Sequence, residues 1–591
     1  MLKDWVYDNR KDLLFIFFCW LIVSIVMFTQ KWESISNLEL RDNDDYMRYV
    51  QFMDWIKHGN WYLEAIPRFN PEDGVIIHWS RVPDFLLAGT TLSLAPYVGL
   101  ALSSYIAISV VPLFYMLCFS LAVFAFVDHY LGKDFRFIGM IFSLGSHAIV
   151  KFFPGSIDHH NIQLIIVALF LTLTPLNDSQ VKMRFRWTLQ ALLIALSMWI
   201  GLDNFIFFAL YIAVYSFYCF IKKYSWIPYF YKLCLGTSLL SSFFSILNRP
   251  IDEFFNVHYD ALSIPFIGCF AFGGIFLLIV NNLPIENKCN RIKLLIVTPV
   301  AMITTFPLLI LFPELIQGAY ANYPNLLMKY WLGHVIEAQS MLSIIQNEGI
   351  ISTNNFILFF IPALSYPLFK KRTTELDIIY VILIFYLLLS FFWQIRVITT
   401  CFILSAPLQA YVLLNLANKT KSAILSAIFL IMGIPFSIII AITSFQGLLG
   451  LQQNTIKNPN SAVNNISIFF DEYNISKRKI LTGIDTGTKI LAKTDNSIVA
   501  APYHRNIPGN KLSISIFLET NENKIISSLK ERNIEYILIN RDKQLKRISN
   551  SADETSLIKR LTSDRPPEWL KLVNDKSPES YQLFKFKENY E

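Results

Sequence analysis

Charged residues are scarce in this chain. Of its 591 residues only 16% are Asp, Glu, Lys or Arg, whereas 54% are hydrophobic. An ordinary soluble protein of this length carries more charge, because its surface must stay in contact with water. The composition therefore excludes a soluble globular protein and predicts an integral membrane protein.

Cysteine is also sparse, and its distribution excludes two kinds of site. All seven cysteines lie in or beside apolar segments, and none lies in the polar region after Gly450. Neither a disulfide framework nor a zinc site follows from this spacing. The sequence also shows no internal repeat and no low-complexity tract.

The positive charge is dispersed rather than concentrated. The net charge is +7, but the basic residues are scattered over short loops between apolar runs. Such a distribution sets the orientation of membrane helices, and it offers no basic patch for a phosphate backbone. We therefore exclude a nucleic-acid partner.

The apolar runs predict a polytopic α-helical protein. The run from Leu13 to Thr29 is followed by Lys31-Trp32-Glu33 rather than by a small-residue cleavage site, so it is expected to be a retained first span. Because a span needs about 20 apolar residues, the chain accommodates about thirteen. The other spans are expected near 109–127, 137–153, 161–176, 188–200, 204–221, 227–246, 264–281, 294–312, 355–369, 377–393, 398–416 and 422–443. The segment from Phe85 to about Ile106 is expected to lie along the membrane interface.

The loops between these spans alternate in charge. Lys and Arg gather in alternate loops, which are expected to be cytoplasmic. The opposite set is rich in Asp, Glu and His, and it comprises 30–84, 154–160, 201–204, 248–263, 313–354 and 394–396. We predict a transmembrane domain over 1–450, with long outer loops at 30–84 and 313–354. Residues 451–591 are polar with short β-branched runs, which predicts a soluble α/β domain on the outer side.

Two polar clusters lie in the predicted outer loops. The run from Asp42 to Arg48 contains three aspartates, which either cap the following helix or bind a metal. Gly155-Ser156-Ile157-Asp158-His159-His160 forms a tight turn, in which Asp158 is either a cap or a metal ligand. Carboxylates with an imidazole suit Mn²⁺ or Mg²⁺, whereas zinc would recruit more His or Cys.

Two further residues lie in the same set of loops. Glu337 is in the long loop 313–354, and Arg396 lies where two predicted spans meet. An arginine at a helix end either anchors that helix by snorkelling or grips a phosphate with its guanidinium fork. These residues would supply metal ligands, a phosphate-binding arginine and a loop acid on one face. Together they favour an enzyme that transfers a group from a phosphorylated lipid.

In the order of these motifs the chain resembles the catalytic subunit of oligosaccharyltransferases, within the GT-C class of glycosyltransferases. Asn43-Asp44-Asp45-Tyr46 is similar to the first acidic motif of that family, which implies Asp44 as a metal ligand, with Asp45 one register away. The second motif corresponds to Asp158 and His160. Val335-Ile336-Glu337 is similar to the loop motif that ends in a glutamate near metal and acceptor. Arg396 corresponds to the arginine that contacts the donor phosphate.

The C-terminal region departs from the family. A Trp-Trp-Asp-Tyr-Gly motif there holds the hydroxyl residue of the acceptor sequon, but the matching stretch, 482–488, keeps only Asp485 and Gly487. We therefore expect an altered acceptor pocket, with Asp485 and His504 as acceptor-binding residues. Asparagine as the acceptor is in doubt.

The resemblance implies an α-helical GT-C membrane protein that transfers a sugar or oligosaccharide from a polyprenyl-(di)phosphate-linked donor. Asp44, Asp45, Asp158 and Glu337 would be catalytic, a Mn²⁺ or Mg²⁺ ion would be bound, and the acceptor would be a protein or a glycolipid. The implied location is a bacterial inner membrane with the site on the periplasmic face.

Two alternatives stay open at this point. One is a GT-C enzyme that adds a monosaccharide to a glycolipid such as lipopolysaccharide, and the other is a polytopic lipid or glycan transporter. Transport sites usually lie near the midplane of the membrane, whereas these acids lie at helix ends. An O-antigen-ligase-like enzyme is disfavoured, because a metal-independent site would not need Asp44 together with Asp158 and His160.

Overall fold

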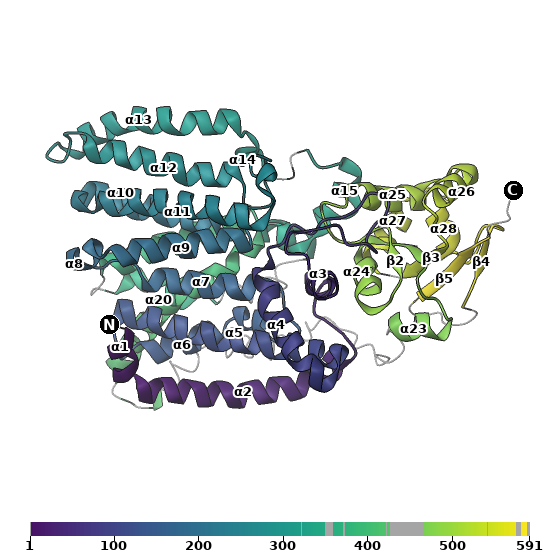
Figure 1. Ribbon diagram of the computed structural model, residues 1–591. Helices are drawn as coiled ribbons and strands as arrows, with labels where there is room; N and C mark the ends of the chain where they lie inside the picture. The colour runs from purple at the N-terminus through teal and green to yellow at the C-terminus, as the bar shows by residue number, and fades with distance from the viewer. Residues whose placement is uncertain are drawn as a thin grey trace.

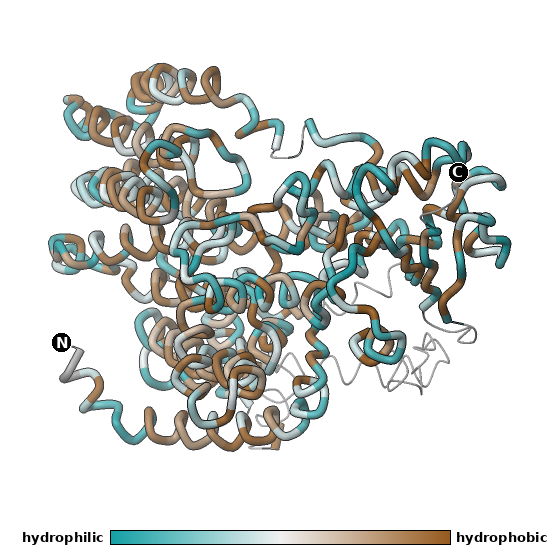
Figure 2. Tube along the Cα trace, turned by 45° about the vertical axis from the view of Figure 1, so that its right-hand side comes forward, coloured by the Kyte–Doolittle hydropathy of each residue, from teal (hydrophilic) through white to brown (hydrophobic). Residues whose placement is uncertain are grey.

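A bundle of long helices forms one half of the molecule and an α/β domain forms the other half (Figure 1). This computed structural model describes residues 2–318, 320, 322–348, 359–369, 373–420, 422, 424–425, 466–540, 542–574 and 581–587. Figure 2 shows hydrophobic residues along the helices of the bundle and hydrophilic ones over much of the C-terminal domain. The two halves meet at the ends of the bundle helices.

Within the described residues, eight helical segments are long and apolar enough to cross a membrane. Their helices are α2 (Arg10–Ser36), α5 (Leu100–Leu131), α10 (Phe205–Lys222), α11 (Ile227–Asn248), α12 (Ile264–Asn282), α13 (Asn290–Leu311), α19 (Thr374–Phe392) and α20 (Ile398–Lys419). Each coincides with a span expected from the hydropathy pattern. The protein is therefore an integral membrane protein.

Other expected spans are short or interrupted in the structure. The segment 137–153 is divided into α6 (Arg136–Leu144) and a 3₁₀ helix (His147–Phe152). The helix is interrupted at Ser146, whose hydroxyl caps the 3₁₀ helix by accepting a hydrogen bond from the amide of Ala148. The remaining bundle elements are α1 (Leu2–Asp8), α7 (His160–Thr172), α8 (Asp178–Lys182), α9 (Arg184–Ile200), a 3₁₀ turn (Tyr224–Trp226), α18 (Ile361–Leu364) and a 3₁₀ turn (Tyr366–Leu368). The expected span 422–443 and the first part of 355–369 lie outside the described residues.

The segment expected along the interface consists of parts of two helices. Helix α4 covers Arg81–Val98, and α5 begins at Leu100. Gly99 between them has φ +81°, a value that side chains other than glycine rarely adopt, so the chain turns there. Helix α5 therefore begins earlier than the hydropathy pattern indicated.

The loops of the acid-rich set contain short helices of their own. Loop 30–84 contributes α3 (Asn43–His58), which packs against α4 and α24. The loop between α11 and α12 contains a 3₁₀ turn (Ile251–Glu253). Loop 313–354 contains α14 (Glu314–Gln317), α15 (Asn325–Tyr330), 3₁₀ turns at Leu332–His334 and Ile336–Ala338, and α16 (Met341–Glu348), and a further 3₁₀ turn (Ile395–Val397) precedes α20.

The C-terminal domain has one mixed sheet with strand order β2-β1-β3-β5-β4. Strands β2, β1 and β3 run parallel, and β5 pairs antiparallel with both β3 and β4. The strands are β1 (Lys479–Thr482), β2 (Ser497–Ile498), β3 (Tyr536–Asn540), β4 (Leu570–Leu572) and β5 (Tyr581–Phe586). The helices are α23 (Ile466–Glu472), α24 (Ile484–Lys493), α25 (Ile507–Leu518), α26 (Glu522–Glu531), α27 (Lys543–Ser551) and α28 (Leu557–Thr562). The α/β character expected from the sequence is confirmed, and β4 is an addition to it.

The first outer loop ties the C-terminal domain to the bundle. Phe69 is fully buried in a core shared with residues of that domain. The amide of Ile498 donates to the carbonyl of Arg68, and the amide of Asn70 donates to the carbonyl of Ile498. The guanidinium of Arg68 donates to three backbone carbonyls, those of Leu491, Thr494 and Asn496. The loop thus extends the edge of the sheet beside β2.

Candidate active site

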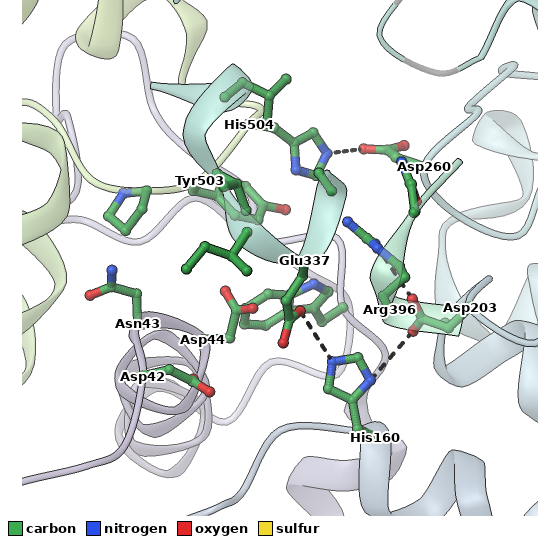
Figure 3. A pocket seen from close by; sticks show the side chains of 18 of the residues that line it. Asp42, Asn43, Asp44, His160, Asp203, Asp260, Glu337, Arg396, Tyr503 and His504 are labelled. Atoms are coloured by element: carbon green, nitrogen blue, oxygen red, sulfur yellow. Dashed lines mark hydrogen bonds and ion pairs between the residues drawn. The ribbon is translucent and has the colours of Figure 1, made fainter. Parts of the chain in front are cut away.

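A cavity of about 1130 Å³ lies between the bundle and the C-terminal domain. Its walls come from all six loops that the charge pattern assigned to one side, together with the C-terminal domain. Of the residues singled out in the sequence, the lining includes Asp44, His160, Glu337, Arg396, Asp485 and His504. Segments that are hundreds of residues apart thus share one polar cavity, part of which Figure 3 shows.

Three aspartates at the start of α3 have different surroundings. Asp42 is the N-cap, and its carboxylate accepts a hydrogen bond from the amide of Asp45 at 3.0 Å. Asp44 faces the cavity (Figure 3). The Oδ1 atom of Asp45 accepts hydrogen bonds from the amides of Ile157, at 2.7 Å, and Asp158, at 3.0 Å. The capping interpretation therefore applies to Asp42, while Asp45 fixes the turn that carries Asp158.

Asp158 belongs to a chain of hydrogen bonds. His159 bridges Asp158, with Nδ1 to Oδ1 at 2.6 Å, and Asp203, with Nε2 to Oδ2 at 2.7 Å. Burial disfavours the charged imidazole, but Asp158 and Asp203 outweigh it and raise the pKa of His159 to about 10. Burial also opposes ionisation of Asp158, yet His159 and His160 hold its pKa well below the usual range. His159 is thus a cation that orients two carboxylates.

His160 and Glu337 meet at the centre of the site (Figure 3). The His160 Nε2 atom is 3.2 Å from Asp158 Oδ2 and 3.9 Å from Glu337 Oε2. Lys151 Nζ lies 3.4 Å from Glu337 Oε1. Although burial acts to raise it, the pKa of Glu337 is lowered, chiefly by Lys151. The loop glutamate is therefore held as a carboxylate beside the histidine turn.

Arg396 reaches the same chain from the opposite wall. Its Nη1 atom is 3.6 Å from Asp203 Oδ1, and a third of its side chain is exposed. Its Nε atom is buried and has no hydrogen-bond partner in the part of the chain that the structure describes. The guanidinium is therefore anchored at one edge and has donors left for an anionic ligand.

The residues present fit a divalent cation. Asp158 and His160, with His159, place ligand atoms within 4.8 Å of one another, and among the described residues Asp44 is not part of that group. Asp44 forms no hydrogen bond or ion pair within the described ranges. Burial and the neighbouring charges of Asp158, Asp42 and Glu337 raise its pKa well above the usual range. Asp158 and His160 offer the oxygen and imidazole donors that suit Mn²⁺ or Mg²⁺, and Asp44 lines the same cavity as His160.

The C-terminal domain contributes a crevice to the cavity. From β1 the chain passes to β2 on one side, and then to β3 on the other side of β1. Such a reversal of strand order opens a ligand-binding crevice at the carboxyl ends of parallel strands. Asp485, in the first turn of α24 after β1, and Asp542, the N-cap of α27 after β3, both lie there and line the cavity. Burial and Asp542 raise the pKa of Asp485 to about 6.

His504 lines the cavity on the side of the loop between α11 and α12. Its Nε2 atom is 2.7 Å from Oδ2 of Asp260, and Arg505 donates to both oxygens of the same carboxylate, each at 2.7 Å. His78 packs edge-on against the His504 ring, with centroids 5.2 Å apart. Figure 3 shows His504, Tyr503 and Asp260 along one wall of the site.

The sequence interpretation missed four charged residues of this site: Asp203, Lys151, Asp260 and Asp542. Asp203 and Asp260 both lie in short outer loops that the sequence interpretation delimited, so an acid in such a loop was a usable signal. Nothing local singles out Asp542, because its role depends on the reversal of strand order.

The fold of this chain is similar to that of solved oligosaccharyltransferase structures. The archaeal oligosaccharyltransferase AglB from Archaeoglobus fulgidus, in complex with an inhibitory peptide and a dolichol-phosphate, has a TM-score of 0.62 at 14% identity. The alignment covers 90% of this chain and 70% of that chain.

Two further solved structures are similar. The Archaeoglobus fulgidus oligosaccharyltransferase in complex with Zn and sulfate gives a TM-score of 0.57 at 14% identity, over 90% of this chain and 69% of the other. ArnT from Cupriavidus metallidurans, bound to undecaprenyl phosphate, gives 0.40 at 8% identity, over 96% and 97%. No family profile and no curated protein sequence matches the chain. The similarity to AglB confirms the predicted fold class.

Proposed function

We propose that this protein is a glycosyltransferase that moves a sugar or oligosaccharide from a polyprenyl-(di)phosphate-linked donor to an acceptor. The observation that carries the proposal is that Asp44, His160, Glu337 and Arg396 line one cavity, with Asp158 3.2 Å behind His160. Carboxylates for a cation and a partly free guanidinium are the groups that a phosphate leaving group needs. The fold shared with AglB, which was solved with a dolichol-phosphate, supports the same donor class.

Asp44, Asp158 and His160 would hold a Mn²⁺ or Mg²⁺ ion. When bound, such an ion neutralises negative charge on a phosphate leaving group. Asp45 keeps the Asp158 turn in position through its two backbone hydrogen bonds. His159 fixes the orientation of Asp158, because both of its ring nitrogens are already engaged by carboxylates.

Arg396 would bind the donor phosphate directly. Its link to Asp203 orients the guanidinium, and that aspartate is itself held by His159. Glu337 lies near His160 at the centre of the cavity and would contact the acceptor side of the reacting centre. These roles separate a phosphate end from an acceptor end within the same cavity.

The acceptor would enter along the C-terminal domain, past Asp485 and His504. Asp485 retains the position of the family aspartate, but both tryptophans of the sequon-binding motif are absent. The proposed acceptor classes are therefore a protein and a membrane glycolipid, the second favoured by the missing tryptophans. The charge pattern of the loops supports a non-cytoplasmic position for this cavity. The proposed location is a bacterial inner membrane with the cavity on the periplasmic side.

The test is transfer of radiolabelled sugar from a polyprenyl-linked donor, extracted from the producing cells, to an Asn-X-Thr peptide and in parallel to lipid A vesicles. Chelation with EDTA should stop transfer, and Mn²⁺ or Mg²⁺ should restore it. R396A should weaken donor binding by about 1.5–3 kcal/mol, since a buried phosphate loses a charge-assisted pair. R565A is the matched control, because Arg565 is an exposed arginine outside the cavity.

Three outcomes would contradict the proposal. Movement of the intact donor across a vesicle membrane without loss of its sugar would indicate a transporter. Unchanged donor binding in R396A would remove Arg396 from the phosphate site. Efficient, sequon-dependent transfer to the peptide would show that asparagine is the acceptor despite the missing tryptophans.

A further inference from the structure

His504 and Asp260 form a pair at the edge of the cavity, and the proposed roles give this pair no part in the chemical step. They come from separate parts of the chain: Asp260 precedes α12, and His504 follows β2 in the C-terminal domain. The Nε2–Oδ2 distance is 2.7 Å. The His504 side chain is 20% exposed, which leaves part of the ring accessible from the cavity it lines.

The hydrogen bond to Asp260 fixes the state of the imidazole. Arg505 donates hydrogen bonds to both oxygens of Asp260. Burial acts to raise the pKa of Asp260, but the hydrogen bonds from Arg505 and His504 outweigh it and hold this pKa far below the usual range. An ionised Asp260 accepts the Nε2 proton of His504, which leaves Nδ1 as the ring nitrogen with a lone pair. Within the described residues Nδ1 makes no hydrogen bond.

A metal site is the competing interpretation of this cluster. His78, Asp260 and His504 place ligand atoms within 4.8 Å of one another. However, Arg505 already engages both Asp260 oxygens, and its positive charge would repel a cation bound there. The Nδ1 atom of His78 is also engaged, 2.5 Å from the hydroxyl of Tyr503. The cluster is therefore better suited to orient an imidazole than to hold an ion.

The pair is close to the proposed reaction centre. Tyr320 packs edge-on against the His504 ring, with centroids 5.7 Å apart. Tyr320 and His504 line the same cavity as Arg396 and Asp44. The pair therefore opens on the cavity that holds the residues assigned to the donor phosphate and the cation.

We propose that His504, oriented by Asp260, is the general base of the transfer and that the acceptor is a hydroxyl group of a membrane glycolipid. The inference rests on the proposed function. The acceptor oxygen forms the bond to the anomeric carbon, and the bond from that carbon to the phosphate oxygen breaks. The acceptor proton moves to Nδ1 of His504, and the polyprenyl phosphate or diphosphate leaves with the electron pair.

Two observations favour this acceptor. An imidazole with a free nitrogen is the usual base for activating a hydroxyl nucleophile, whereas an amide nitrogen has no available lone pair for the same step. Asp260 also lies in the loop between α11 and α12, both of which are long enough to cross a membrane. This wall of the cavity is therefore continuous with the membrane helices, along which a glycolipid head group would approach.

The experiment measures transfer to lipid A vesicles for H504A, D260N and the control H58Q across a range of pH. His58 is an exposed histidine at the end of α3. We expect H504A to lose at least about 100-fold in rate, the contribution of a general base. We expect added imidazole to restore part of that rate, which a purely structural role of His504 would not allow. D260N should change the pH dependence, and H58Q should match the wild type.

H504A and H58Q leave unchanged the other charged and titratable groups around the imidazole. These groups are Asp260, Arg505, His78, Tyr503, Tyr320 and Arg249. The pH profile of transfer should differ between wild type and H504A, and H58Q should keep the wild-type profile. The inference is wrong if H504A transfers to glycolipid at the wild-type rate, or if imidazole has no effect. It is also wrong if the enzyme transfers sugar to a sequon peptide and not to the lipid A vesicles.

Failure of the inference and failure of the proposed function are distinguishable. D44N and R396A test the donor end in the same assay. If they abolish consumption of the donor while H504A is unaffected, only the inference is wrong. If donor consumption persists in both D44N and R396A, the proposed function is itself wrong.

Discussion

At the scale of single residues, the adjacent acids of α3 differ in what they contact. Asp42 accepts a backbone amide, Asp45 accepts two, and Asp44 has no hydrogen bond or ion pair in the described structure. An acid that is buried without a partner costs stability unless a ligand compensates for it. Asp44 lines the cavity without a protein partner among the described residues, so it is the acid of this run expected to bind a ligand there.

We predict that D44N lowers transfer by roughly 100-fold or more, because it removes a charged ligand from the phosphate site. D42N is the matched control, since it keeps a capping side chain at the same helix end and should retain most of the activity. Transfer from labelled lipid-linked donor measures both. Equal losses in the two variants would show that Asp44 has no special role.

A second residue-scale prediction concerns pH. Burial and Asp542 raise the pKa of Asp485 to about 6, while Arg547 opposes them. Because the folded state binds this proton more tightly than the unfolded state, the contribution of Asp485 to stability decreases as pH rises from about 4 to about 6. D485N should therefore unfold at a higher temperature than wild type at pH 7.5, and the difference should shrink at pH 4. A constant difference across this range would contradict the raised pKa.

At the scale of elements, the turn before α7 depends on α3. The amides of Ile157 and Asp158 both donate hydrogen bonds to one oxygen of Asp45. D45A should leave two buried donors unsatisfied, at a cost of roughly 1–3 kcal/mol each. Thermal unfolding in detergent should show this loss, and D54A on the same helix, at a half-buried position, should show much less. Unchanged stability in D45A would mean that the turn is held by other contacts.

The edge of the C-terminal sheet depends on the first outer loop. Arg68 donates to the carbonyls of Leu491, Thr494 and Asn496. R68A should speed hydrogen exchange at β2 and along the end of α24. R478A is the control, because Arg478 pairs with Glu535 in an exposed position within the C-terminal domain. Equal exchange in R68A and wild type would show that apolar packing alone attaches the domain.

At the scale of the whole molecule, the lining loops and the C-terminal domain should lie on one side of the membrane. In a background with the exposed Cys19 and Cys289 replaced by serine, we predict that an impermeant thiol reagent labels E531C on intact cells. K182C, in α8 on the opposite set of loops, should react only after permeabilisation. The reverse pattern would overturn the orientation.

Several features of the fold could be predicted from the sequence because they are local. Apolar runs identify α2, α5 and α10–α13, and short β-branched runs identify β1, β3 and β5. Local patterns were insufficient at 137–153, where hydropathy alone did not predict the break at Ser146. The loop set that shares the cavity also followed from charge, since Lys and Arg distribution is a property of each loop by itself.

By itself, the sequence determined a helical membrane protein with a C-terminal α/β domain and the loops from which a site would be built. Only the tertiary structure decided that Asp42 and Asp44 line the cavity and Asp45 does not, that His159 links Asp158 to Asp203, and that Asp260 contacts His504. The physical reason is range. Hydropathy and charge act within one segment, whereas these contacts join segments far apart in the chain, and their geometry exists only once the helices and the sheet have packed.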